Sequence, residues 1–316
     1  MPTENYTSTS TASLGTSLVQ TAYDRYVEFA LRAMPLIRDV ADKRPAQQAM
    51  PGSSVVFQLY TDLSAVTGTL TETVDPDSVA LGNTSNVTVT LNEYGNAAIA
   101  TRKLELFSLS DVDPAIADII AFNMADSIDN FAQTVLRQGT NVIYSGGGST
   151  TTGVTGGAAS QITSANVRRA IAKLRANKAV PRVGELYWVG IHPEVSHDLR
   201  AETGAGGWRE AHVYNESGAG NLWPGSIGVY EGAMFVESPR MYNATDGGSS
   251  ARVFRTILAG KQALAEAVAQ EPGVVIGPVT DKLMRFRPIG WYGVLGFARY
   301  REDALFRIET SSSISD

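Results

Sequence analysis

The stretch from residue 114 to residue 138 constrains the fold more than any other, because it predicts one long amphipathic helix. Apolar side chains recur at steps of three and four, which places them on one stripe of a helix. The stripe consists of Ile116, Ile120, Met124, Ile128, Phe131 and Val135. Polar side chains such as Asp129 and Gln133 fall away from it.

The ends of this helix carry the expected signals. Asp113 is a suitable N-cap, Pro114 fits the first turn because its missing N–H costs nothing there, and Gly139 ends the helix. At 1.5 Å per residue the helix would be roughly 37 Å long. We therefore expect a spine from whose two ends most of the chain hangs.

Composition limits the possible function classes. The chain has 316 residues, enough for two subdomains or one elaborate domain, with 18% charged residues and 30 glycines. It contains no cysteine, which excludes disulfides and thiolate metal sites. The net charge of −6, without a basic block, argues against a dedicated nucleic-acid reader. We find no membrane-spanning apolar run and no signal peptide, so we expect a soluble protein made in the cytoplasm.

The N-terminal half predicts an arm, a helix and a long β excursion. Residues 1–22 are rich in Ser and Thr, which is typical of a disordered terminus or of an arm that orders against a neighbouring subunit. Residues 23–45 predict a helix that Pro35 should kink or split. Residues 46–107 switch to period two, with strands expected at 54–60, 86–91 and 97–107.

A lone β-hairpin of this reach is only marginally stable in water. The excursion is therefore better explained if a second copy of the protein packs against it. A buried local sheet is the alternative.

The second half predicts an α/β unit and returning strands. A Gly-rich segment, 139–161, reads as a flexible connector or loose hairpin. The remaining elements are a helix at 163–178, a strand at 186–191, a helix at 193–201, a Gly- and Trp-rich loop at 204–225, strands at 226–228 and 233–236 around a Glu231-Gly232 turn, and a strand at 253–258. Residues 282–309 predict a hairpin of long strands packed on the spine.

The helix at 163–178 points Arg168, Arg169, Lys173 and Arg175 outward. We interpret this basic face as a solvated helix surface.

Catalytic and metal-binding patterns are weak. His192, Glu194 and His197 form the only cluster that resembles metal ligands, but the two histidines are five residues apart. The helical zinc motif needs four, and five places the imidazoles about 140° apart. No dinucleotide-binding, phosphate-loop or nucleophile-elbow motif occurs. We predict no catalytic residue, cofactor or metal. A soluble metal-dependent hydrolase that uses His192 and His197 remains an alternative.

The order of these parts resembles the major capsid protein of tailed bacteriophages, with the Hong Kong 97-type coat fold. Local motifs are similar to the phage N4-like coat proteins, in which a strand, a His-Pro pair and a helix are followed by a Pro-Gly-x-Ile-Gly pattern. The matching stretches are 191–200, 223–238, Pro278 with Asp281–Leu283, and Gly290–Tyr292. Ser226 stands where the pattern would have Glu.

The resemblance implies an α+β fold with a division of labour along the chain. Residues 1–22 would be the N-terminal arm, 23–45 the N-terminal helix, and 46–107 the extended β-hairpin loop with strands of a peripheral domain. The remaining parts would be the spine helix with its Gly-rich connector (108–162), the axial domain (163–260) and the C-terminal strands of the peripheral domain (261–316).

The resemblance further implies a virion capsid protein, assembled in the host cytoplasm, that encloses double-stranded DNA in an icosahedral shell. Its partners would be further copies of itself in pentamers and hexamers, a portal protein, and packaged DNA without sequence-specific binding, but no membrane. The need for scaffolding or decoration proteins stays open. The candidates for contacts between subunits are Tyr6, Leu14, Asp75, Asp77, Leu81, Trp208, Tyr214 and Trp223.

Some shells of this fold are cross-linked through a lysine on the extended loop, but residues 44–102 contain no lysine. We therefore expect a shell without covalent cross-links. An encapsulin-like nanocompartment shell, which shares the fold but encloses an enzyme, is the nearest alternative, and the Ser/Thr-rich start argues against it.

Overall fold

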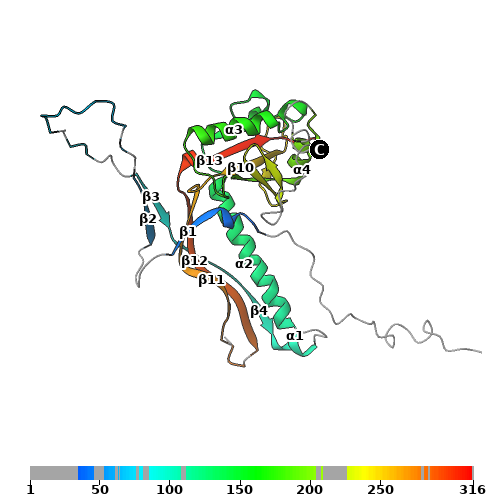
Figure 1. Cartoon of the computed structure of the whole chain (residues 1–316). Helices are drawn as coiled ribbons and strands as arrows, with labels where there is room; N and C mark the ends of the chain where they lie inside the picture. The colour runs from blue at the N-terminus through cyan, green and yellow to red at the C-terminus, as the bar shows by residue number, and fades with distance from the viewer. Residues whose placement is uncertain are drawn as a thin grey trace, which may run out of the picture.

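The computed structural model describes residues 35–45, 53–60, 63, 65–75, 78–80, 85–107, 112–203, 208, 226–278, 281–283 and 285–314. Figure 1 shows a large α/β lobe at one end of a long helix and a narrow foot at its other end. A β-hairpin stands apart from this helix and leads into a projecting loop (Figure 1). The expected α+β architecture around a spine is present.

The spine is α2 (Val112–Leu136), which confirms the predicted long helix. It packs on a four-stranded sheet through aromatic contacts. Tyr94 stacks on Phe131 with ring centroids 4.2 Å apart. The indole Nε1–H of Trp291 donates to the side-chain oxygen of Asn123 at 3.0 Å. The amphipathic helix therefore packs its apolar face on this sheet, as its hydrophobic period predicts.

Two polar residues of the spine are buried, contrary to the expectation that they fall away from the packed face. Asp129 is 1% exposed and Gln133 is 5% exposed. Asp129 accepts the backbone N–H of Ile37 at 2.6 Å, and Gln133 donates to the carbonyl of Arg240 at 2.7 Å. Both side chains satisfy backbone groups that the chain brings to the helix, so their burial is compensated.

The sheet under the spine has the order β1-β11-β12-β4. Its strands are β1 (Ala41–Pro45), β11 (Leu264–Ile276), β12 (Phe286–Arg299) and β4 (Asn92–Thr101). β1 runs parallel to β11, and the other neighbours are antiparallel. The strand at 264–276 is not predicted from the sequence, because Gln270-Glu271-Pro272-Gly273 breaks the period there, and the pairing shifts register at the same place.

The helix expected over 23–45 is wrong within its described part. Residues Arg38–Val40 form one 3-10 turn, and β1 follows at once. Val40 and Ala41 are buried, so this segment joins the sheet edge, where parallel pairing with β11 satisfies its backbone. Residues 23–34 lie outside the described part of the chain.

The strand expected at 97–107 is only half right. β4 ends at Thr101, and residues Arg102–Phe107 form the short helix α1. The hydroxyl of Thr101 accepts the backbone N–H of Leu104 at 3.3 Å, as an N-cap does. Because the following Arg-Lys-Leu-Glu-Leu run consists of good helix formers, local propensity prevails once the cap is in place.

The projecting hairpin consists of β2 (Ser54–Leu59) and β3 (Ser85–Thr90), close to the predicted positions. Its base is anchored by Phe57 and Val89, which are 1% and 0% exposed. Phe57 lies 5.4 Å from the ring centroid of Tyr300. Gly296 of β12 lets the end of β3 lie directly against β12, since a Cβ there would collide with the carbonyl of Thr90. The base is thus part of the core, whereas the loop beyond it is not.

The large lobe holds a seven-stranded sheet in the order β5-β13-β10-β6-β8-β7, with β9 paired to β10. The strands are β5 (Val142–Tyr144), β6 (Tyr187–Ile191), β7 (Ser226–Tyr230), β8 (Ala233–Glu237), β9 (Asn243–Ala244), β10 (Val253–Ala259) and β13 (Leu305–Thr310). Helices α3 (Ser164–Ala176) and α4 (Pro193–Ala201) accompany it. The predicted central strand at 186–191 is confirmed, and all five residues of β6 are buried.

The predicted C-terminal hairpin at 282–309 is wrong. β12 pairs with β11 and β4 in the smaller sheet, whereas β13 pairs with β10 and β5 in the larger one. The 3-10 turn Glu302–Ala304 redirects the chain between them. Both strands are apolar enough to be core strands, and sequence period alone does not say which sheet each one joins.

The Gly-rich segment at 139–161 is also more ordered than expected. It contains β5 and three 3-10 turns, with Val154 and Ser160 buried. The hydroxyl of Ser145 donates to the carbonyl of Gln161 at 2.6 Å, which closes the segment on itself.

Candidate assembly surfaces

Large apolar side chains are exposed along the loop beyond the β2–β3 hairpin. We call this set the loop patch: Tyr60, Leu63, Val66, Leu70, Val74 and Val79. Their exposed fractions run from 52% at Leu63 to 88% at Val66. Residues 45–101 contain no Lys or Arg, so the segment combines apolar side chains with acidic ones. Covering such an apolar surface with a partner is favourable, because it removes apolar side chains from water.

A second set lies at the distal end of the spine. We call it the foot patch: Ile99, Leu104, Leu106, Phe107, Val275, Ile276 and Leu283. The backbone N–H of Arg102 donates to the carbonyl of Arg285, which ties α1 to the β11–β12 turn region. Leu106 and Phe107 are 73% and 77% exposed. The foot therefore presents a cluster from three chain segments, and sequence analysis missed it because it assigned 102–107 to a strand.

The described part of the large lobe differs from both projections. Its only exposed large apolar side chains are Val180 and Ile314, while its core is tightly filled around Trp188, Phe235 and Phe254. A monomeric protein scatters exposed apolar residues singly. Here they gather on the two projections, where no described part of the chain covers them.

The structure places two of the eight predicted contact residues. Asp75 is exposed on the loop. Trp208 is only 5% exposed and packs edge-on against Phe235, with ring centroids 5.0 Å apart, and beside Tyr230. This indole therefore belongs to the core of its own subunit and offers a neighbour almost no surface. The remaining candidates lie outside the described residues: Tyr6, Leu14, Asp77, Leu81, Tyr214 and Trp223.

His192 serves as a helix cap. Its Nδ1 accepts the backbone N–H of Glu194 at 3.3 Å, at the start of α4. Burial lowers the pKa of His192, which keeps the imidazole neutral and able to accept. His197 is 57% exposed and lies beside Asp198. Among the described residues, no group of three or more His, Cys, Asp or Glu side chains is arranged to hold a metal ion.

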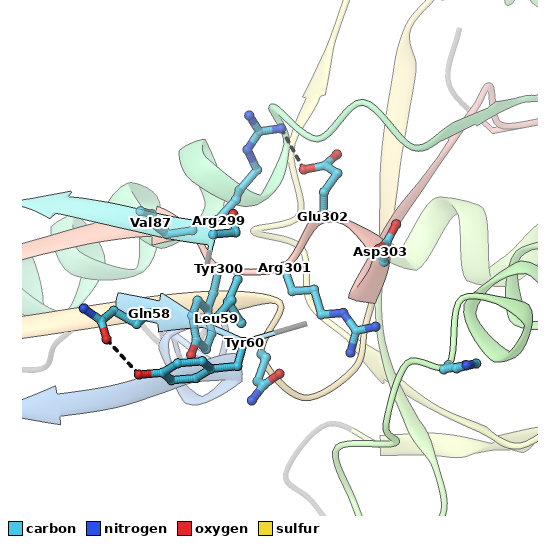
Figure 2. A pocket seen from close by; sticks show the side chains of 13 residues that line it. Gln58, Leu59, Tyr60, Val87, Arg299, Tyr300, Arg301, Glu302 and Asp303 are labelled. Carbon is cyan, nitrogen blue, oxygen red and sulfur yellow. Dashed lines mark hydrogen bonds and ion pairs between the residues drawn. The ribbon is translucent and has the colours of Figure 1, made fainter. Parts of the chain in front are cut away.

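A groove of about 1080 Å³ separates the base of the hairpin from the large lobe (Figure 2). Tyr60 donates to Gln58 on one wall, at 3.2 Å. On the other wall Arg299 pairs with Glu302 at 3.0 Å, and Arg301 donates to the carbonyl of Asn177. The lining contains neither His nor Cys, and its Arg299 and Glu302 side chains pair with each other. It offers no nucleophile with a neighbouring base.

Buried ion pairs join the start of the described chain to the rest of the molecule. Glu266, which is fully buried, pairs with Arg38 at 2.7 Å. Asp129 pairs with Arg240 at 3.2 Å. Burial raises the pKa of Asp129, against the lowering effects of the Ile37 N–H and of Arg240. These contacts fix the spine, the sheet and the lobe as one frame from which the two patches project.

None of the helices in the described part of the chain is both long and apolar enough to cross a bilayer.

Comparison with known proteins gives a consistent result. The family model described as "Phage capsid protein" matches residues 19–314. No curated protein matches the chain. The fold is similar to the capsid of Ralstonia phage GP4, with a TM-score of 0.77 and 14% identity over 98% of this chain and 100% of that one.

Two further solved structures have the same fold. The head structure of Helicobacter pylori bacteriophage KHP40 has a TM-score of 0.71 and 14% identity, and covers 97% of this chain and 99% of its own. The Cyanophage Pam1 capsid has a TM-score of 0.69 and 17% identity, with coverage of 95% and 99%. The architecture is thus of the Hong Kong 97 type. The finer likeness to phage N4-like proteins stays a prediction.

Proposed function

Because this chain belongs to the phage capsid protein family and forms the capsid shell, we propose that the loop patch and the foot patch are the surfaces through which its copies join. The copies would form pentamers and hexamers of an icosahedral shell. The observation that carries the proposal is the gathering of exposed apolar side chains on two projections, while the described part of the large lobe is well packed.

The energetics favour this assignment. Burial of apolar surface stabilises an interface by about 25 cal/mol per Å². A subunit that contacts several neighbours through narrow projections multiplies buried area per residue. The hairpin is fixed to the core at Phe57 and Val89, so the loop keeps a defined starting direction while its described apolar side chains stay exposed.

We propose that the shell is held without covalent cross-links, since residues 44–102 contain no lysine. No catalytic step is required of the subunit. We further propose that it assembles in the host cytoplasm, becomes part of the virion, meets a portal protein at one vertex, and encloses DNA without reading its sequence. Stability beyond these contacts would come from a decoration protein or from the arm.

Negative-stain electron microscopy of the expressed full-length chain tests the proposal. We expect closed shells from the wild-type chain. Dispersed subunits are expected from a variant with Val66→Asp and Phe107→Asp, which places one charge in each patch. Normal shells from this variant would show that neither patch lies in an interface.

A further inference from the structure

Helix α3 carries a strong positive charge on a protein whose net charge is −6. Residues 164–178 hold Arg168, Arg169, Lys173, Arg175 and Lys178 but no acidic residue. All five cationic side chains are exposed. The opposite face of the helix is buried through Val167, Ala170, Ile171 and Leu174. The charge is therefore concentrated on one surface of the large lobe.

The cations are arranged in two rows. At 100° per residue, Arg168 and Arg175 share one edge of the helix, and Arg169 and Lys173 lie about 120° around from them. Between the rows run Ala165, Ala172 and Ala176, which are all exposed. The exposed face of α3 is thus a row of alanine methyl groups with long cationic side chains on both sides.

Most of these cationic side chains form no ion pair among the described residues. Among the ion pairs of the described residues, none includes Arg168, Arg169 or Lys173. The Glu202 carboxylate accepts from the N–H and hydroxyl of Ser164, and Arg175 donates only to the backbone carbonyl of Glu231. A cation row left without acidic partners attracts an external anion.

The chemistry of this face fits a nucleic-acid backbone better than a protein. Protein interfaces place aromatic and large apolar side chains at their centre and deplete charge there. The α3 face has only alanines at its centre, unlike the loop and foot patches. Arg fits phosphate oxygens through two parallel N–H donors. Double-stranded DNA offers one phosphate per roughly 1.7 Å of its axis, so several phosphates lie within the length of α3.

We propose that the exposed face of α3 is a sequence-independent binding surface for the phosphate backbone of double-stranded DNA, and that it contacts the outermost packaged DNA. The proposal rests on the shell function above. It assigns a DNA-facing role to a helix surface that sequence analysis interpreted as merely solvated.

The test measures binding of the full-length, unassembled chain to a fluorescent 30-base-pair duplex by anisotropy, at several NaCl concentrations below 0.2 M. Two duplexes of unrelated sequence should bind equally. Each phosphate contact lowers the slope of log K against log salt by about 0.9. In the triple variant Arg168→Gln, Arg169→Gln and Lys173→Gln, the negative slope of log K against log salt should therefore become shallower by roughly 2.7. The variant should also lose most of the affinity for the duplex.

A matched control removes the same charge elsewhere. Arg102→Gln, Lys103→Gln and Lys282→Gln remove three exposed cations from the foot. This variant should keep at least half of the wild-type affinity. Equal losses from both triples would reduce the effect to net charge and overturn the proposal.

Shell assembly by the α3 triple variant separates the two possible partners. We expect normal shells, because the face takes no part in subunit contacts. A variant that keeps DNA binding but no longer assembles would assign the face to a neighbouring copy and overturn the proposal. Failure of the wild-type chain to form shells would instead contradict the proposed function and leave the DNA measurement standing.

Discussion

The carboxylate of Asp129, in the C-terminal half of the spine helix, accepts the backbone N–H of Ile37 across 2.6 Å. The same carboxylate also accepts the N–H of Arg38 and pairs with Arg240. One side chain therefore joins the spine to the 3-10 turn that precedes β1 and to the large lobe.

Replacement of Asp129 by Ala should destabilise the subunit by about 3 kcal/mol, since it leaves Arg240 and two backbone donors without their buried partner. Urea unfolding of the unassembled chain measures the loss. Asp118→Ala is the control on the same helix, where an exposed carboxylate should matter by less than about 0.5 kcal/mol. Equal unfolding midpoints for the two variants would show that the contacts of Asp129 do not stabilise the subunit.

Replacement of Phe57 by Ala should release the hairpin from the core. Truncation of a fully buried Phe typically costs about 3–5 kcal/mol. Because Phe57 anchors the hairpin through Tyr300, we expect faster hydrogen exchange of the backbone amides of β2 and β3 and little change in β10. Val56→Ala, at a neighbouring side chain that is 52% exposed, should leave exchange unchanged.

Acid should weaken the start of α4. Burial lowers the pKa of His192, while Glu194 and Glu237 raise it and Arg252 lowers it further. The neutral imidazole is the form that caps the helix. Its contribution is therefore complete above pH 6.5, the ordinary value, and is lost as pH falls from there toward the lowered pKa of the folded state.

His192→Asn tests this pH dependence, because Asn caps helices but does not titrate. Thermal midpoints of the variant should change less between pH 7 and pH 5 than those of the wild type. His197→Asn serves as the control, since His197 is exposed and caps no helix. An unchanged pH profile in His192→Asn would assign the acid sensitivity to other groups.

Introducing an acidic residue into either patch should impair assembly without destabilising the folded subunit. Val66→Asp and Phe107→Asp, at side chains 88% and 77% exposed, should shift the stability of the unassembled chain by less than about 0.5 kcal/mol. Each should reduce the yield of shells at least tenfold by light scattering. Val180→Asp, on the large lobe, should assemble normally. A folding defect that matched the assembly defect would contradict this separation.

Mature shells should dissolve into single chains in hot detergent. We expect one band at 33.7 kDa in denaturing electrophoresis, without a ladder of multiples. A ladder that disappears in Lys103→Arg would identify a covalent bond through the lysine that follows the loop.

Sequence analysis predicted the spine, the paired strands of the hairpin, β6, α3 and the Glu231-Gly232 turn, because each depends on local signals. Residues Glu231 and Gly232 both have positive φ, which the turn requires. Local signals failed where a choice between sheets decides the outcome, as for β12 and β13. They also failed at Asp129, whose polarity predicted solvent whereas distant backbone groups provided its partners.

The assembly surfaces show the same limit. The sequence suggests Trp208 as a contact residue because it is a prominent aromatic, but an aromatic residue is equally suited to the core, where Trp208 lies. Only the folded structure distinguishes the two roles, because exposure depends on what the rest of the chain covers. The foot patch combines residues from α1, β4 and the β11–β12 region, so no single sequence window contains it.

Residues 305–310 form β13, which lies between β10 and β5 in the larger sheet. A polypeptide interrupted before this strand leaves β10 with an open edge and β5 without its neighbour. Such a truncated chain cannot form the complete seven-stranded sheet of the large lobe. We therefore expect a chain that ends before residue 305 to be excluded from the assembled particle, because its large lobe lacks a central strand.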